Sequence, residues 1–260
     1  MAPIVSTGLA LKAPAFGAPS AESGVLSFAA VQKAFELAAR GVVSAIVTAP
    51  ISKIAWQAAG VPYTDHTEFF GSKLDCRAEM VLSVPAKRLW CLLVTRHMPL
   101  RQAIGRLSAP RVVHAAKRLA DALKVVGIAR PRLALCGLNP HAGEEGLLGG
   151  EERRILAPAA ASARRAGINL SGPIAADAAW RLHATGVYDG VVSLYHDQAL
   201  IALKMGGGLG VVNWTLGPRG FIRTSPGHGT AFDIAGKGIA SCAATAAAAD
   251  LACALYARGA

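Results

Sequence analysis

The chain has 260 residues, 53% of them hydrophobic, and carries a formal net charge of +11 at pH 7. This length allows one large domain or two smaller ones, with a sizeable core that needs neither disulfides nor a structural metal. No apolar run of about 18 residues is free of charge, which argues against a membrane span. Lys and Arg are spread along the chain rather than gathered in a basic block. The positive charge therefore indicates a phosphorylated small molecule as the partner rather than nucleic acid.

In chain order, short β-branched runs alternate with longer periodic stretches rich in Ala, Leu and Arg. This alternation is typical of βα repeats around a mostly parallel sheet, so the predicted class is α/β. The pattern predicts helices at 26–39, 109–125, 151–166, 175–184 and 230–257, the last broken at 236–238. It predicts strands at 42–48, 80–84, 90–95, 132–136, 190–194 and 210–214, each ending near Pro, Gly, Asn or His.

The start of the chain lacks the basic residues, apolar core and cleavage site of a secretory signal, so a cytoplasmic location is expected. Five cysteines are an odd number outside any CxxC pattern, and they are predicted to be buried thiols. The glycine-rich piece 205–210 is either a hinge, a close backbone approach to a ligand, or an ordinary flexible turn.

Three histidines share one sequence context: His97, His141 and His196 each come directly after a predicted strand. Ligands bind outside the carboxyl ends of strands in open parallel sheets, so the three could converge on one site. Imidazoles suit a transition metal, and three protein ligands leave positions open for substrate. The alternative is that each is a solvated loop histidine; His114 and His183, in charged helical stretches, are predicted to lie on the surface.

Other polar groups could bind an anion. Thr67 could cap a following helix, and the adjacent His66 could reach a phosphate or carboxylate at its N-terminus. Lys204 could bind substrate or pair with a surface carboxylate, whereas Arg223, between apolar residues and hydroxyls, is more typical of an anion clamp. The segment 228–238 is a weak nucleotide signal, because the chain has neither a GxGxxG fingerprint nor a Walker A motif.

From about residue 26 onward, the chain carries an ordered series of motifs: Thr48-Ala-Pro-Ile-Ser-Lys, Asp65-His-Thr-Glu-Phe-Phe, Leu138-Asn-Pro-His-Ala-Gly-Glu, Tyr195-His-Asp-Gln, Phe221-Ile-Arg-Thr-Ser and His228-Gly-Thr-Ala. In type and order these motifs resemble those of the 4-hydroxythreonine-4-phosphate dehydrogenase family. The resemblance implies a two-domain α/β/α sandwich of the isocitrate/isopropylmalate dehydrogenase-like type, with mostly parallel sheets and the active site in a cleft. Residues 26–260 would form the two lobes, with a boundary that the sequence does not fix.

The same resemblance implies a role for each candidate residue. The metal ligands would be His97, His141 and His196, one of them supplied across the interface of a homodimer, and the metal would be zinc, magnesium or cobalt. The substrate would contact His66, Thr67, Lys204, Asn213 and Arg223, and NAD would bind at a turn that includes His228, Gly229 and Asp233. Lys204, Asp197 or Asp177 would move the protons, and the sequence does not choose among them.

The implied reaction is the NAD-dependent oxidation and decarboxylation of 4-phosphohydroxy-L-threonine to 3-amino-2-oxopropyl phosphate in pyridoxal 5'-phosphate (vitamin B6) biosynthesis. Two alternatives stay open: a paralogue acting on D-threonate or D-erythronate 4-phosphate in sugar-acid catabolism, and a truncated, inactive member. The second alternative arises because the family's usual first βα segment, with its Gly-Glu-Pro-type turn, has no counterpart here. Residues 1–25, rich in Pro, Ala and Gly, resemble the end of that segment.

Overall fold

The computed structural model describes residues 3–9, 14–218 and 220–260, which divide into two compact units. Unit 1 holds the described residues of Met1–Glu79 and Thr215–Arg258, with Ala260. Unit 2 holds Met80–Trp214, with Gly259. Because the chain leaves unit 1, builds unit 2 and returns, the first unit is made of two segments far apart in sequence.

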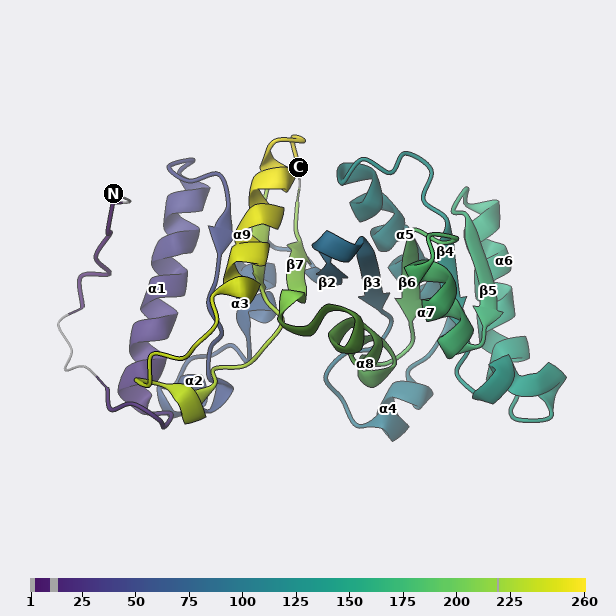
Figure 1. Cartoon of the computed structure of the whole chain (residues 1–260), viewed down its shortest axis with the longest axis horizontal. Coiled ribbons are helices and arrows are strands. Elements are labelled where there is room, and N and C mark those ends of the chain that lie inside the picture. The colour runs from purple at the N-terminus through teal and green to yellow at the C-terminus, as the bar shows by residue number, and fades with distance from the viewer. Residues whose placement is uncertain (1–2, 10–13, 219) are drawn as a thin grey trace. The chain divides into compact units, whose positions relative to one another are not determined.

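Strands and helices alternate through both units (Figure 1). The strands are β1 (Ile46–Val47), β2 (Glu79–Val84), β3 (Leu89–Leu93), β4 (Leu133–Cys136), β5 (Leu170–Ile174), β6 (Gly190–Ser193), β7 (Val212–Leu216) and β8 (Ile222–Pro226). The α-helices are α1 (Ala21–Ala39), α2 (Lys53–Ala58), α3 (His66–Lys73), α4 (Leu100–Gly105), α5 (Ala109–Val125), α6 (Ala157–Arg165), α7 (Ala176–Ala184), α8 (His196–Gly207) and α9 (Ala243–Tyr256). None of the helices in the described ranges is long and apolar enough to cross a membrane.

The sheet of unit 2 has the strand order β2-β3-β6-β4-β5. β2 runs antiparallel to β3, and the other neighbours are parallel, with Cys91 opposite Val191 and Leu133 opposite Gly190. Helices α7 and α8 cover the face nearer the viewer in Figure 1, and α5 lies behind. Parallel strands must be joined by crossovers, and the helices between them provide these.

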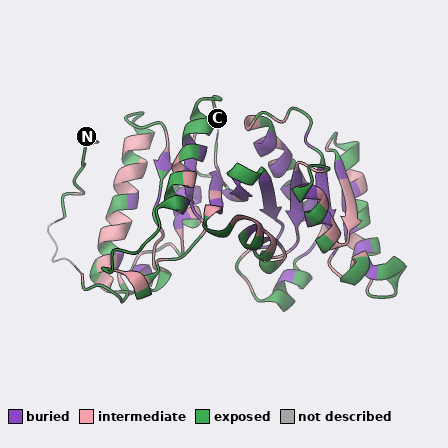
Figure 2. Cartoon of the chain, viewed as in Figure 1, coloured by how far each residue is buried: buried purple, intermediate pink, exposed green. Residues whose placement is uncertain are grey.

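The core of unit 2 follows the two-residue alternation of its strands. Val191 packs in one apolar cluster with Trp180 of α7 and Leu203 of α8. A side chain at the preceding position, Gly190, would instead run into Leu119 and Leu123 of α5. Figure 2 shows β3, β4 and β6 as continuously buried, as expected of parallel strands covered on both faces, whereas the edge strand β5 is mostly half-buried.

Unit 1 is built around an aromatic core rather than a wide sheet. β1 pairs in parallel with β8, and α9 packs against β8 through a stripe of small residues and leucines: Ala244, Ala248, Leu251, Ala252 and Leu255. The opposite cluster gathers Trp56, Phe69 and Phe70 with the partly buried rings of Phe28, Phe35, Tyr63 and Phe221. These rings meet mostly edge to face or tilted, at centroid distances of 5.2–6.1 Å, so they interlock as aromatic pairs prefer to do.

The predicted α/β class with mostly parallel strands is confirmed. The final helix was predicted too long, because only Ala243–Tyr256 is α-helical and Phe232–Ile234 forms a separate 3₁₀ turn between glycines. β5 and β8 were missed, since Gly172 and Pro173 resemble a turn and Arg223 breaks the apolar run of β8. The cap of α3 is Asp65 and not Thr67, because Oδ1 of Asp65 accepts from the Glu68 N–H at 3.0 Å.

Two predictions about which side chains are buried were also wrong. His183 was predicted on the surface but is only 3% exposed: its Nε2 accepts from the Trp90 N–H at 2.9 Å, and its Nδ1 lies 2.8 Å from the Tyr188 carbonyl oxygen. Its polarity is therefore satisfied inside the fold, and burial lowers its pKa. Of the cysteines, only Cys91 and Cys136 are buried, whereas Cys76 is half-buried and Cys242 and Cys253 are exposed.

Candidate active site

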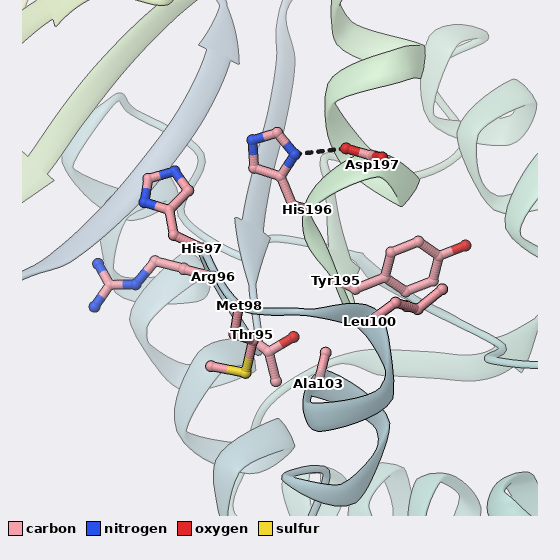
Figure 3. A pocket seen from close by; sticks show the side chains of 9 residues that line it. All are labelled: Thr95, Arg96, His97, Met98, Leu100, Ala103, Tyr195, His196 and Asp197. Carbon is pink, nitrogen blue, oxygen red and sulfur yellow. Dashed lines mark hydrogen bonds and ion pairs between the residues drawn. The ribbon is translucent and has the colours of Figure 1, made fainter.

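A pocket of about 280 Å³ lies in unit 2, beyond the carboxyl ends of two adjacent parallel strands, β3 and β6. Its walls are residues 95–98 after β3, Leu100 and Ala103 of α4, and residues 195–197 at the start of α8 (Figure 3). The strands are in register up to the pair Leu93–Ser193, so the segments that follow them emerge side by side. This is the position at which open α/β sheets bind ligands.

Side-chain hydrogen bonds fix the strand ends that form this pocket. The Thr95 hydroxyl donates to the Leu194 carbonyl at 2.7 Å, which ties β3 to β6. Gln198 accepts from the Leu194 N–H at 2.7 Å and donates to the Gly137 carbonyl at 2.8 Å, which ties β6 to the segment after β4. The Trp180 indole N–H donates to the carbonyl of Gln198 at 2.9 Å. Gln198 thus connects the ends of β4 and β6 with α7, and Thr95 connects the end of β3 with that of β6.

Two of the predicted histidines meet at this pocket. The ring centroids of His97 and His196 are 5.5 Å apart, and Figure 3 shows both rings on the same side, with Arg96 extending away from His196. Nδ1 of His196 is 2.6 Å from Oδ1 of Asp197, which leaves Nε2 for another ligand. Imidazoles with a carboxylate behind them suit zinc or cobalt better than magnesium.

Two imidazoles do not complete such a site, because zinc sites use at least three protein ligands. Within the part of the chain that the structure describes, no group of three or more His, Cys, Asp or Glu side chains could hold a metal ion. The third predicted ligand, His141, is exposed and is not among the residues that line the pocket. The donors therefore fit a metal once a third ligand joins them.

His141 begins a turn with unusual backbone geometry. His141, Ala142, Glu144 and Glu145 have φ between 42 and 54°, and Gly143 has φ 84°. A left-handed conformation costs an L-residue roughly 1–2 kcal/mol, so contacts elsewhere must stabilise the turn.

Unit 1 contains a second group of predicted site residues, centred on a buried cation. Arg223 is 3% exposed, and its Nε and Nη2 both donate to the Thr48 hydroxyl, while Nη1 donates to the Thr215 hydroxyl at 3.0 Å. Burial lowers the pKa of Arg223 to about 10, against the opposing charge of Asp65, so the guanidinium is charged at pH 7. A buried charge bonded to neutral hydroxyls attracts an anion.

His66 lies in the same cluster, stacked on the Phe70 ring at a centroid distance of 6.3 Å, and the Arg223 guanidinium also lies over that ring. Burial, and secondarily the charge of Arg223, lowers the pKa of His66 to about 3, so its ring is neutral at pH 7. Its Nε2 is buried and has no hydrogen-bond partner among the described residues. Because buried polar atoms are normally satisfied, this atom fits a ligand position.

The other predicted residues are spread over both units. In unit 2, Asp197 lines the pocket, whereas Lys204 is exposed further along α8, Asp177 is exposed on α7, and Asn213 is half-buried on β7. In unit 1, Thr67 is half-buried in the first turn of α3. The residues predicted to bind the cofactor are exposed: His228, Gly229 and Asp233.

Four residues of these sites were not predicted: Thr48, Thr95, Gln198 and Thr215. Each acts through a single hydroxyl or amide; Thr48, Thr95 and Gln198 bond residues distant in sequence, whereas Thr215 bonds Arg223 on the next strand. Thr48 and Gln198 do belong to recognised motifs, so their presence in the motif was the available signal. Thr95 and Thr215 gave none, because a threonine near a strand end is explained by strand propensity alone.

Comparison with known proteins shows the family to which this chain belongs. The chain matches the family model described as pyridoxal phosphate biosynthetic protein PdxA over residues 2–252. It is 44% identical to the 4-hydroxythreonine-4-phosphate dehydrogenase of Beijerinckia indica over 227 residues, which cover 87% of this chain and 67% of that one. It is 43% identical to the D-threonate 4-phosphate dehydrogenase of Salmonella typhimurium over 222 residues, covering 85% and 67%.

Among solved structures, the 4-hydroxythreonine-4-phosphate dehydrogenase of Klebsiella pneumoniae superimposes with a TM-score of 0.80 at 42% identity, covering 92% of this chain and 72% of that one. The likeness in sequence and fold to proteins named as dehydrogenases places the chain among the oxidoreductases. Within that class, the chain belongs to the PdxA family.

Proposed function

We propose that this protein is a metal- and NAD-dependent dehydrogenase that oxidises and decarboxylates 4-phosphohydroxy-L-threonine in pyridoxal phosphate biosynthesis, as a cytoplasmic homodimer. The observation that carries the proposal is the pair of imidazoles, His97 and His196, at the carboxyl ends of β3 and β6. Membership of the PdxA family supports the reaction class.

The reaction consists of two steps. The hydroxyl carbon loses a hydride to NAD⁺ and its oxygen loses a proton, which gives a ketone β to the carboxylate. The bond to the carboxylate then breaks, carbon dioxide leaves, and the remaining electron pair on carbon takes up a proton to give 3-amino-2-oxopropyl phosphate. The protein must therefore bind anions, accept one proton and return another.

His97 and His196 would hold the metal with His141 as the third ligand, one of the three coming from a second copy of the chain. A bound divalent ion supplies Lewis acidity toward the substrate oxygens and lowers the pKa of the alcohol. Asp197, 2.6 Å from Nδ1 of His196, fixes the orientation of that ring.

Arg223 and His66 would bind an anionic group of the substrate. The guanidinium is already held by Thr48 and Thr215, so it loses little side-chain entropy when it binds an oxyanion. Nε2 of His66 supplies a further hydrogen bond. The resemblance adds Thr67, Lys204 and Asn213 to the substrate contacts.

Asp197 is the strongest of the three candidates for proton transfer, because it lines the pocket and neither Lys204 nor Asp177 does. For NAD, the resemblance favours His228, Gly229 and Asp233. The surroundings of Gly229 suit a phosphate approaching the backbone, since a side chain there would meet no described atom within 4 Å.

D-threonate 4-phosphate is the second candidate substrate, because a relative named for that activity is 43% identical to this chain. D-erythronate 4-phosphate would present the same phosphate, hydroxyl and carboxylate groups. All three candidates use the same anion site and the same oxidation, so the substrate is decided only by measurement.

The test is NADH formation at 340 nm with each of the three phosphorylated acids, with and without EDTA followed by Zn²⁺ or Co²⁺. Wild type is compared with His196→Ala and with His114→Ala, which alters an exposed histidine on α5. We expect metal-dependent turnover with 4-phosphohydroxy-L-threonine that falls at least 10²-fold in His196→Ala and is unchanged in His114→Ala.

A higher kcat/KM for D-threonate or D-erythronate 4-phosphate would replace the proposed substrate and keep the reaction. Metal-independent turnover would contradict the metal site. A folded protein that turns over none of the acids would favour the truncated, inactive alternative.

A further inference from the structure

The turn that begins at His141 is stabilised by one buried carboxylate, that of Glu152, which lies further along the chain. Glu152 is 4% exposed. Its Oε1 accepts from the N–H groups of Leu138 and Asn139, both at 2.8 Å, and its Oε2 accepts from the Asn139 side-chain amide at 2.9 Å. The three donors are the last polar N–H groups before the Pro140-His141 pair.

The turn is also shaped around this carboxylate. Gly143 faces it so closely that a Cβ at that position would lie 2.7 Å from Oε2 of Glu152. Burial alone would raise the pKa of Glu152, but the hydrogen bonds from Asn139 and Leu138 lower it overall, so both oxygens remain acceptors at pH 7. A protonated or shortened side chain at this position would leave the left-handed turn without its anchor.

We propose that Glu152 is a positioning residue that holds the His141 turn in its left-handed form and so presents the His141 imidazole to a metal. This inference rests on the proposed function only in taking His141 as a metal ligand. The carboxylate itself does not touch the metal. It acts by bonding the backbone on the N-terminal side of His141, as outer groups around metal sites do.

The experiment measures Co²⁺ binding by visible absorption and by calorimetry, with no substrate and no turnover. The variants are Glu152→Gln, Glu152→Ala and His141→Ala. Gln keeps one carbonyl acceptor for the two backbone N–H groups, whereas its NH₂ faces the Asn139 amide donor; Ala removes all three bonds. Leu119→Ala, a cavity in the buried face of α5, is the control for a general loss of stability.

We expect the Kd for Co²⁺ to rise about tenfold in Glu152→Gln and by up to about 10²-fold in Glu152→Ala. Amide hydrogen exchange across residues 138–147 should speed up in the same order. Leu119→Ala should lower the Tm and leave the Kd unchanged. If Glu152→Ala does not fold, the Glu152→Gln result decides.

Wild-type Kd values and exchange rates in Glu152→Gln, together with weak binding by His141→Ala, would overturn this inference and leave the proposed function standing. Unchanged binding by His141→Ala would instead remove His141 from the metal site, and with it the premise.

Discussion

The two candidate regions handle charge in opposite ways. In unit 1, Arg223 is 3% exposed and lies among aromatic rings, bonded only to threonine hydroxyls in the described structure. In unit 2, the side chain of His196 is 45% exposed and that of its partner Asp197 is 72% exposed. The cation in unit 1 is therefore buried away from water before any ligand binds, whereas the imidazoles in unit 2 are solvated.

This difference predicts in which region an anionic ligand gains more free energy on binding. A buried cation without an anion is destabilising, so an incoming phosphate or carboxylate gains the full benefit of neutralising it. Solvated imidazoles gain less from a single charge but remain accessible to metal ions. We therefore expect variants of unit 1 to affect stability and function in opposite directions, and variants of the pocket to affect function alone.

The largest effect is expected for Arg223→Met, which replaces the buried cation by an apolar side chain of similar length. We expect kcat/KM to fall about 10³-fold, since removing one member of a buried charged pair costs roughly 4 kcal/mol. The Tm without ligand should stay the same or rise, because the buried charge is gone. Steady-state kinetics and thermal unfolding in phosphate-free buffer measure both.

Arg132→Met is the matched control, because Arg132 is exposed and paired with Asp189 at 3.0 Å on the surface of unit 2. Because the pair is exposed to solvent, it should contribute little to stability and nothing to turnover. A strongly lowered Tm in Arg223→Met, or retained turnover, would mean that the cation is structural and the comparison between the units fails.

A smaller effect is expected for Asp197→Asn, which tests the solvated pocket. As a proton carrier, Asp197 should contribute about 10²-fold to kcat, with less than a tenfold change in the Kd for Co²⁺. The Tm should not move, because the side chain is exposed. If saturating metal restores kcat, Asp197 only orients His196, and proton transfer belongs to Lys204 or Asp177.

The third effect is a pH dependence of stability from His66. Its pKa is about 3 in the folded protein, against the ordinary histidine value of 6.5, so the unfolded chain takes up a proton first as the pH falls. The stabilisation is therefore complete above about pH 6.5 and is lost as the pH falls toward 3, by roughly 2 kcal/mol between pH 7 and pH 5.

Urea unfolding at pH 7 and pH 5 should show this loss in wild type and in His114→Gln, an exposed control, but not in His66→Gln. An equal pH dependence in all three proteins would show that His66 is solvated, and that the dry interior assigned to unit 1 is wrong.

The sequence predicted the fold class because strand and helix periods differ sharply in most of unit 2. It failed where side-chain chemistry overrides the period: β8 carries Arg223, which is buried only because Thr48 and Thr215, far apart in sequence, accept its bonds. The surface prediction for His183 failed for the same reason, since both ring nitrogens are satisfied by backbone groups.

For the candidate site, position after a strand was enough to bring His97 and His196 together. The same reasoning did not bring His141 to the pocket, because His141 lies beyond the end of β4 in a left-handed turn that its sequence context did not reveal. Local spacing therefore predicts which strand delivers a residue, while contacts from other segments decide where its side chain ends up.

Gln198 has a consequence for the order in which this protein folds. Its side chain bonds Gly137, 61 residues earlier in the sequence, and Leu194, four residues earlier. Because the first bond joins the segments that follow β4 and β6, we expect it to form only after these strands have paired, so that the pocket closes after the sheet of unit 2. Substitution of Gln198 should therefore speed unfolding and leave the refolding rate unchanged, which makes the pocket a late addition to an already formed core.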